Sequence, residues 1–142
     1  ETESFINKIP VYETDMEEYV TYNPNKLLMT APPEIAAKHE QILAGKYKNQ
    51  LSISRSADYF IEIMPKGIDK AASIEVLIYK LKIRKENTIA CGDGYNDISM
   101  VKYAGIGVAM ENAVDEVKQV ADYVTASNNE DGIAKVVEKF VL

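Results

Sequence analysis

The stretch from Thr88 to Ala104 constrains the fold of this chain more than any other. It begins with an apolar run, Thr88-Ile89-Ala90-Cys91, continues with Gly92-Asp93-Gly94-Tyr95-Asn96-Asp97, and ends in a helical pattern over residues 98–104. This order predicts a buried strand, a tight turn and the start of a helix. Ligands of open α/β sheets bind at the carboxyl ends of strands. We therefore expect the polar turn 92–97 to lie at a ligand site.

Two carboxylates and a carboxamide are crowded into this turn. Asp93, Asn96 and Asp97 lie close together in sequence, and neighbouring carboxylates repel each other unless a cation or a proton separates them. Mg²⁺ would remove the conflict, because it takes oxygen ligands and keeps several of its waters. The turn therefore predicts a Mg²⁺ site, although an aspartate between two glycines is also typical of an ordinary turn that bonds its own backbone.

Helices and strands alternate in the predicted structure of residues 65–142. Asp69 is a candidate N-cap, and a helix follows with Ile74, Leu77, Ile78 and Leu81 on one face. After the turn we expect a helix to about Ala104 with Gly105 as its C-cap, a strand at 106–110, a helix at 113–120 with Val114, Val117 and Ala121 on one side, a strand at 123–125, and a last helix with Ile133, Val136, Val137 and Phe140 on one face. This alternation predicts an α/β fold with a parallel sheet flanked by helices.

The first part of the chain has a different pattern. We expect a strand at 26–30, a helix that begins at Pro32 or Pro33 and ends near Ala44 with Gly45 as its stop, and strands at 51–54 and 59–63. These elements suggest an α+β unit with antiparallel pairing. Pro and Gly punctuate the segment 64–67, which is therefore the expected boundary between the two parts.

Composition excludes several classes of function. The net charge of −6 argues against a nucleic-acid partner, since such binding depends on neutralising phosphates. No apolar run is long enough to span a bilayer, and no signal peptide is visible, so no membrane partner is expected. The single cysteine, Cys91, cannot form an intrachain disulfide and fits a reducing cytoplasm. Cys91 and the lone His39 are interpreted as packing and surface residues, not as a nucleophile and a ligand.

Several stretches together resemble one known family. Gly92-Asp93-Gly94-Tyr95-Asn96-Asp97-Ile98-Ser99-Met100 is similar to the fourth motif of the haloacid dehalogenase-like (HAD) phosphatases of the Cof type. The segments 107–113, 121–125 and 130–133 match the same type downstream. Upstream, Pro65-Lys66-Gly67-Ile68-Asp69-Lys70 resembles the segment that carries the family's motif-three lysine. The resemblance covers residues 59–142 and is weaker over residues 1–58.

The resemblance implies a fold in two parts. Residues 1–64 would be the C-terminal part of an α+β cap domain, and residues 65–142 the C-terminal half of a Rossmann-like core. The family's nucleophile lies in an Asp-x-Asp motif, which the sequence does not contain. We therefore expect this chain to be a fragment that is inactive alone. The edge of the strand at 88–91 would then be open, which predicts self-association or pairing with the missing N-terminal half.

The resemblance also implies roles for individual residues. Asp93 would be a direct Mg²⁺ ligand, and Asp97 would be a catalytic residue that contacts the metal, chiefly by orienting bound water or the lysine. Lys70 would stabilise the phosphoryl oxygens and the nucleophile, and Asn96 would bind the substrate phosphate. The simpler alternatives are a helix N-cap for Asp97, a turn residue for Asn96 and a solvated surface position for Lys70. Lys66 is a rival for the lysine role by spacing.

The implied reaction is Mg²⁺-dependent hydrolysis of a small phosphorylated metabolite through an aspartyl phosphate. Two alternatives remain open at this point: a non-catalytic binding module with the same fold, and the phosphorylation domain of an ion pump, whose hinge has a similar motif. A calcium-binding helix–loop–helix is excluded, because the spacing of Asp93, Asn96 and Asp97 does not fit it and no glutamate closes the loop.

Overall fold

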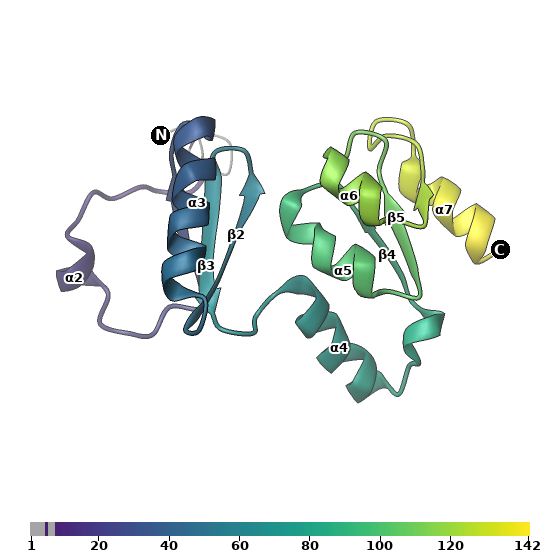
Figure 1. Cartoon of the computed structure of the whole chain (residues 1–142), viewed down its shortest axis with the longest axis horizontal. Coiled ribbons are helices and arrows are strands. Elements are labelled where there is room, and N and C mark those ends of the chain that lie inside the picture. The colour runs from purple at the N-terminus through teal and green to yellow at the C-terminus, as the bar shows by residue number, and fades with distance from the viewer. Residues whose placement is uncertain (1–4, 6–7) are drawn as a thin grey trace.

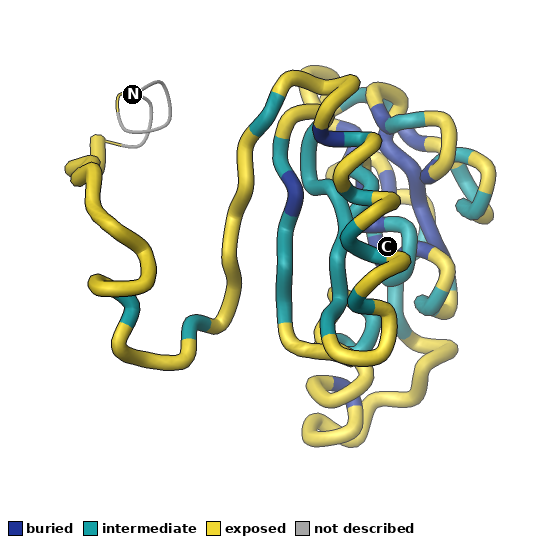
Figure 2. The backbone as a smooth tube through the Cα atoms, turned by 60° about the vertical axis from the view of Figure 1, so that its left-hand side comes forward, coloured by how far each residue is buried: buried dark blue, intermediate teal, exposed yellow. Residues whose placement is uncertain are grey.

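The computed structural model describes residue 5 and residues 8–142, and the first residues of the predicted 1–64 segment lie outside these described residues. Two three-stranded sheets form the structure, one antiparallel and one parallel. Figure 1 shows them side by side, joined by a connection that enters α4 (Lys70–Leu81). An extended arm with the short helix α2 (Met16–Tyr19) precedes the first sheet, and this arm is largely exposed (Figure 2).

The antiparallel sheet follows the predicted α+β pattern. Its strands β1 (Leu27–Thr30), β2 (Leu51–Ala57) and β3 (Phe60–Pro65) are ordered β1-β3-β2, with Leu27 opposite Ile63 and Ile53 opposite Ile63. The helix α3 (Pro33–Tyr47) packs against β2 and β3 (Figure 1). Ala36 on α3 and Ile61 on β3 are fully buried, so they form the centre of this unit.

Several element boundaries in this unit differ from those expected. The strand β3 runs to Pro65, two residues beyond the predicted 59–63 and into the expected boundary segment 64–67. The helix α3 continues through Gly45 to Tyr47, so Gly45 is not its stop. The space around Gly45 is open, and a single glycine inside a helix has only a modest cost in stability, so the helix continues through it. The strand β2 is longer than the predicted 51–54 and reaches Ala57, with a change of register between Arg55 and Ala57.

The parallel sheet carries the second half of the chain. Its strands β4 (Ile89–Gly92), β5 (Ile106–Ala109) and β6 (Tyr123–Val124) are ordered β4-β5-β6. Three helices connect or follow them, at α5 (Ile98–Tyr103), α6 (Asp115–Val120) and α7 (Gly132–Phe140). The predicted α/β class is therefore confirmed, and each strand and helix expected after residue 69 is present.

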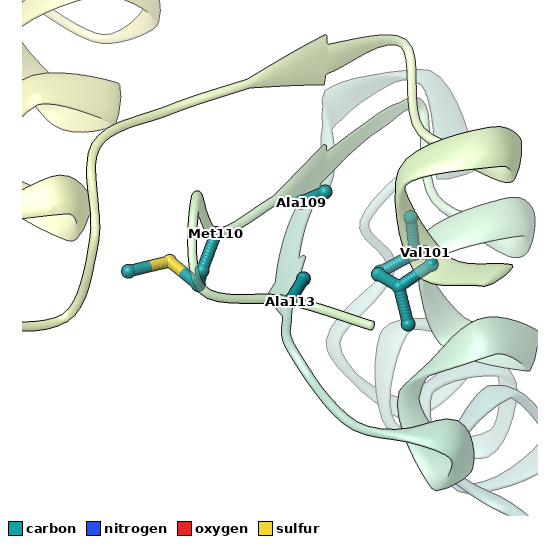
Figure 3. Close-up of a cluster of buried hydrophobic side chains, with 5 residues drawn as sticks. Val101, Ala109, Met110 and Ala113 are labelled. Carbon is teal, nitrogen blue, oxygen red and sulfur yellow. The ribbon is translucent and has the colours of Figure 1, made fainter. Parts of the chain in front are cut away.

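The core of the parallel unit is a cluster of small and medium apolar side chains. Val101 of α5 and Val117 of α6 pack with Ala109, Met110 and Ala113, as Figure 3 shows for four of the five. A Cβ on Gly107 would lie 2.2 Å from the Val101 carbonyl oxygen, so β5 and α5 approach each other closely at this glycine. The expected C-cap at Gly105 is wrong: α5 ends one residue earlier, where the Ala104 amide donates to the Met100 carbonyl.

In the described part of the chain, two predicted amphipathic helices leave about half of their apolar face exposed. In α4 only Ile78 is buried, whereas Leu77 and Leu81 are more than half exposed. In α7 Val136 is buried but Ile133 is half exposed. The strand β4 is paired with β5 on one side and, in the described part of the chain, with no strand on the other.

Across residue 5 and residues 8–142, no helix has the length and apolar character needed to cross a membrane.

Candidate active site

The predicted turn is built at the carboxyl end of β4. The strand ends at Gly92, Asp93 and Gly94 follow, and the 3₁₀ turn η2 (Tyr95–Asp97) leads directly into α5. The Asp97 side chain folds back over this loop, and its Oδ2 accepts hydrogen bonds from the amides of Asp93 (2.9 Å) and Gly94 (3.0 Å). A Cβ on Gly92 would lie only 2.4 Å from the Asp97 Cβ, so glycine is required there.

Asp97 also binds the predicted lysine. Lys70 begins α4, and its Nζ donates to Asp97 Oδ1 in an ion pair that links α4 to the loop after β4. The Asp97 side chain is buried whereas Lys70 is about half exposed. Burial by itself would raise the pKa of Asp97, but the hydrogen bonds from Lys70 and the two loop amides outweigh it, so this pKa is lowered. Asp97 is therefore a charged, preorganised partner for the Lys70 ammonium.

Asp97 occupies the N-cap position of α5, as expected, but the capping hydrogen bond expected from its side chain is wrong. Its side chain makes no capping hydrogen bond to the first turn of α5, because both of its oxygens face the preceding loop and Lys70. The helix α4, by contrast, has its predicted cap: Asp69 Oδ1 accepts from the Ala72 amide at 2.8 Å. Lys70 thus projects from a well-defined helix start.

Asp93 lies in a different environment from Asp97. It is exposed, and its Oδ2 accepts a hydrogen bond from Asn112 Nδ2 at 3.2 Å. Asn112 in turn accepts from the Asn128 amide at 2.9 Å. Because Asn112 follows β5 and Asn128 follows β6, one carboxamide connects the carboxyl ends of all three strands. The sequence analysis assigned no site role to Asn112. Its position just after a strand predicted for the same parallel sheet could have indicated that it lies near the turn 92–97.

Asn96 and Lys70 line a cavity of about 320 Å³ between the two sheets. Its walls combine residues of the antiparallel unit with residues of α4 and α5, among them Ser54, Glu62, Met64, Ile74 and Met100. A second cavity of about 530 Å³ shares Asn96 and is also lined by Arg55, Tyr95 and Glu40. The predicted residues Lys70, Asn96 and Asp97 therefore lie together, with Asp93 beside them on the same loop, whereas Lys66 lies on the exposed connection before α4.

The donor chemistry at this loop fits a hard divalent cation in part. Asp93 offers an exposed carboxylate, the type of ligand that Mg²⁺ prefers. Asp97 already uses both oxygens on Lys70 and the loop amides. Among the residues that the structure describes, no three His, Cys, Asp or Glu side chains are grouped to hold a metal. Asp93 would thus supply one ligand, and the others would be waters, carbonyls or groups beyond the described residues.

Cys91 has no features of a nucleophile. It is partly buried on β4 against the apolar cluster, and burial raises the pKa of its thiol, which disfavours the reactive thiolate. His39 lies exposed on α3. Both positions agree with the packing and surface roles expected from the sequence.

Comparison with known proteins places this geometry in a family. A family model described as haloacid dehalogenase-like hydrolase matches residues 1–137. The Bacillus subtilis 5-amino-6-(5-phospho-D-ribitylamino)uracil phosphatase YitU is 40% identical over 95% of this chain and 51% of its own length. YcsE, a second Bacillus subtilis 5-amino-6-(5-phospho-D-ribitylamino)uracil phosphatase, is 47% identical over 72% of this chain and 41% of its own length.

Solved structures agree. The HAD subclass IIB sugar phosphatase BT4131 is 32% identical with a TM-score of 0.82, over 98% of this chain and 53% of that one. A haloacid dehalogenase-like hydrolase from Bacteroides thetaiotaomicron is 42% identical with a TM-score of 0.75, over 97% of this chain and 52% of that one. The chain thus spans about half the length of these relatives. It belongs to the haloacid dehalogenase-like hydrolase family, as its motifs predicted.

Proposed function

We propose that the protein to which this chain belongs hydrolyses phosphate monoesters of small metabolites. The observation that carries the proposal is the Lys70–Asp97 ion pair, held beside the exposed Asp93 at the carboxyl end of β4. A preorganised ammonium next to a metal-binding carboxylate is what a transferring phosphoryl group needs, since its charge is spread over several oxygens. The phosphatase names of YitU, YcsE and BT4131 support the same reaction class.

Each residue has a separate task in this proposal. Lys70 stabilises the phosphoryl oxygens, and Asp97 is a positioning residue that fixes the ammonium and the loop amides. Asn96 donates its amide N–H to a phosphate oxygen without adding negative charge. Asp93, held by Asn112, would be a ligand of Mg²⁺, which when bound would offset charge on the nucleophile and the phosphoryl group. Asp97 acts through Lys70 in this proposal and not as a direct metal ligand.

The covalent step requires a residue that this sequence does not offer. By family resemblance, an aspartate of an Asp-x-Asp motif attacks phosphorus and forms an aspartyl phosphate, and the second aspartate handles the leaving-group proton. The printed sequence contains no such motif. We therefore expect the 142-residue chain alone to be inactive, with Lys70, Asn96, Asp97 and Asp93 forming one wall of the site.

The division into a cap and a core supports a small organic substrate. In the proposal, residues 1–64 belong to a cap and residues 65–142 to the core, and both contribute walls to the cavities at Lys70 and Asn96. Volumes of about 320 and 530 Å³ are in the range of small-molecule sites. A small cytoplasmic metabolite fits this size. The net charge of −6 argues against nucleic acid, and no membrane partner is proposed.

The uncovered surfaces suggest where further protein binds. The free edge of β4 and the exposed apolar side chains Leu77 and Leu81 on α4 leave backbone donors and apolar area without a partner in the described part of the chain. Open edges of this kind pair readily with another chain. The proposal is that this chain associates with itself or with the N-terminal half of the family fold. A stable monomer in gel filtration would contradict it.

The test of the proposed activity is a screen of phosphate esters on the complete reading frame that contains this chain, with and without Mg²⁺. Turnover that requires Mg²⁺ and is lost in Asp93→Ala, with folding unchanged by circular dichroism, would support the proposal. Turnover that is unaffected by Asp93→Ala would remove the metal assignment. A protein that binds phosphate esters but never releases phosphate would instead be a binding module.

A further inference from the structure

One side chain of the antiparallel unit contacts the active-site loop directly. The guanidinium carbon of Arg55, on β2, lies 4.3 Å from the ring centroid of Tyr95. Tyr95 is the residue between Gly94 and Asn96, in the middle of the loop that carries the candidate site. The Arg55 side chain is only 16% exposed. This stacked pair therefore connects two units that are otherwise built on separate sheets (Figure 1).

A carboxylate from α3 holds the arginine in position. Glu40 Oε2 accepts from Arg55 Nε at 2.8 Å, and Glu40 Oε1 accepts from the Arg55 backbone amide at 3.0 Å. Both oxygens of Glu40 are thus used on one residue, and they fix the backbone amide and the Nε of the side chain that contacts the Tyr95 ring. Burial alone would lower the pKa of Arg55, but the Glu40 carboxylate and, to a lesser degree, the Tyr95 side chain outweigh it, so the pKa is raised and Arg55 is a cation.

A second contact lies beside the first. A Cβ on Gly94 would come within 3.3 Å of the Ser56 carbonyl oxygen, so β2 rests on the loop backbone at the residue next to Arg55. The register of β2 shifts between Arg55 and Ala57, which is where the strand meets the loop. Bulges of this kind redirect side chains near functional sites. The two neighbouring contacts indicate that β2 packs against the loop in one defined position.

We propose that Arg55 is a positioning residue that latches the antiparallel unit onto the active-site loop. Glu40 sets the guanidinium in advance, and the stack on Tyr95 holds β2 over the cavities that Lys70 and Asn96 line. One cation–π contact is weak enough to open and close reversibly. Loss of the latch releases the unit and frees the loop. The consequence for catalysis rests on the proposed function, whereas the latch itself does not.

A purely structural ion pair within the antiparallel unit is the competing explanation for Arg55. The two differ in the role of Tyr95, because Tyr95→Leu leaves the Glu40–Arg55 pair intact and removes only the stack. Tyr95→Phe keeps an aromatic face and should restore the latch. Lys85→Ala is the matched control, since Lys85 stacks on Tyr103 within the parallel unit, at 4.7 Å, and touches no residue of the other sheet in that contact.

The experiment measures the separation of the two units by single-molecule energy transfer. In a Cys91→Ser background, dyes are placed at the exposed positions His39 on α3 and Glu138 on α7 through His39→Cys and Glu138→Cys. The parent should give one narrow population. Arg55→Ala and Tyr95→Leu should each add a second population at lower transfer efficiency, with the ratio of closed to open molecules reduced about tenfold. Tyr95→Phe and Lys85→Ala should match the parent.

The outcomes separate the latch from the proposed activity. Unchanged transfer in folded Tyr95→Leu would overturn the latch, and this variant decides the question even if Arg55→Ala does not fold. A second population in Lys85→Ala as large as in Tyr95→Leu would also overturn it. The energy-transfer measurement uses no substrate, so its result does not depend on the proposed activity. If the latch variants open the molecule but the complete protein has no turnover, only the phosphatase proposal is contradicted. If the complete protein has turnover but Tyr95→Leu does not change the transfer efficiency, only the latch is contradicted.

Discussion

The antiparallel and parallel units bury their residues to different degrees. In the parallel unit the middle strand β5 has Val108 and Ala109 fully buried, with α5 and α6 packed against the sheet. In the antiparallel unit every residue of β1 is exposed, and full burial is reached at Ala36 and Ile61. Figure 2 shows the same contrast along the chain. The polar loop with Asp93 and Asp97 lies on the well-packed unit, whereas the less buried unit contributes cavity walls and the Arg55–Tyr95 contact. Units with few buried apolar contacts open more easily than well-packed ones, so the antiparallel unit is the part in which the proposed latch would matter most.

The largest expected effect is a loss of stability in the antiparallel unit, which has few fully buried residues. Ile61→Ala should cost about 2–5 kcal/mol of unfolding free energy, because it empties a fully buried site on β3. The matched control Leu28→Ala, at a half-exposed position on β1, should change it by less than about 0.5 kcal/mol. Urea unfolding checks both. A loss below about 0.5 kcal/mol in Ile61→Ala would show that this unit does not depend on its small core.

The second prediction concerns the charged group on the better packed unit. Asp97→Asn should lower the free energy of unfolding at pH 7 by about 1.5–3 kcal/mol, since it weakens hydrogen bonds to a carboxylate. The folded pKa of Asp97 lies below its ordinary value of 3.8. Its stabilising contribution is therefore complete above the unfolded pKa and is lost as the pH falls through the folded pKa.

Unfolding followed as a function of pH distinguishes this from a packing effect. The difference between the parent and Asp97→Asn should shrink as the pH is lowered below about 3.8. A difference that stays constant across that range would mean that the charge of Asp97 does not stabilise the loop.

Replacing a glycine by alanine should change the free energy of unfolding in opposite directions in the two units. Gly107→Ala should destabilise by about 1–3 kcal/mol, since its Cβ would lie 2.2 Å from the Val101 carbonyl oxygen. Gly45→Ala on α3 meets open space and should stabilise by about 0.5–1 kcal/mol through helix propensity. Melting temperatures report both. Equal effects of the same sign would contradict the difference in packing.

The smallest predicted effect concerns the support of Asp93. Asn112→Ala removes the donor to Asp93 Oδ2 and the link to Asn128. Removing an outer partner of a metal ligand typically weakens metal binding, and we expect about a tenfold loss of Mg²⁺ affinity in the complete protein. Isothermal titration measures it, with Asn129→Ala, at an exposed position beyond that network, as the control. Equal affinities in the parent and Asn112→Ala would remove Asn112 from the site.

The local sequence pattern predicted those helices, strands and site residues whose structure is determined by their neighbours in sequence. Apolar runs located β4 and β5, and the Asp69 cap located the start of α4. The end of α3 was wrong because an exposed glycine does not by itself stop a helix whose neighbours favour it. Asp97 is the N-cap residue of α5, but its predicted capping hydrogen bond was wrong, because Lys70, far away in sequence, and the loop amides bind the same carboxylate.

Contacts between residues far apart in sequence could not be predicted from local patterns. The Asn112–Asp93 hydrogen bond depends on two strands ending at the same edge of the sheet, and the Arg55–Tyr95 stack depends on how two sheets meet. Neither has a periodic or motif signature in one segment. The apolar faces of α4 and α7 were predicted from periodicity, but periodicity could not predict that about half of each face is exposed in the described part of the chain.

The most direct measurement compares two lysines in the complete protein. Mg²⁺-dependent release of phosphate is assayed for the parent, Lys70→Ala and Lys66→Ala, with folding verified for each. Lys70 is paired with Asp97 at the loop, whereas Lys66 lies on the exposed connection before α4. We expect a loss of about 100- to 1,000-fold in Lys70→Ala and little change in Lys66→Ala. Full turnover in Lys70→Ala would contradict the claim that this loop performs the phosphate chemistry.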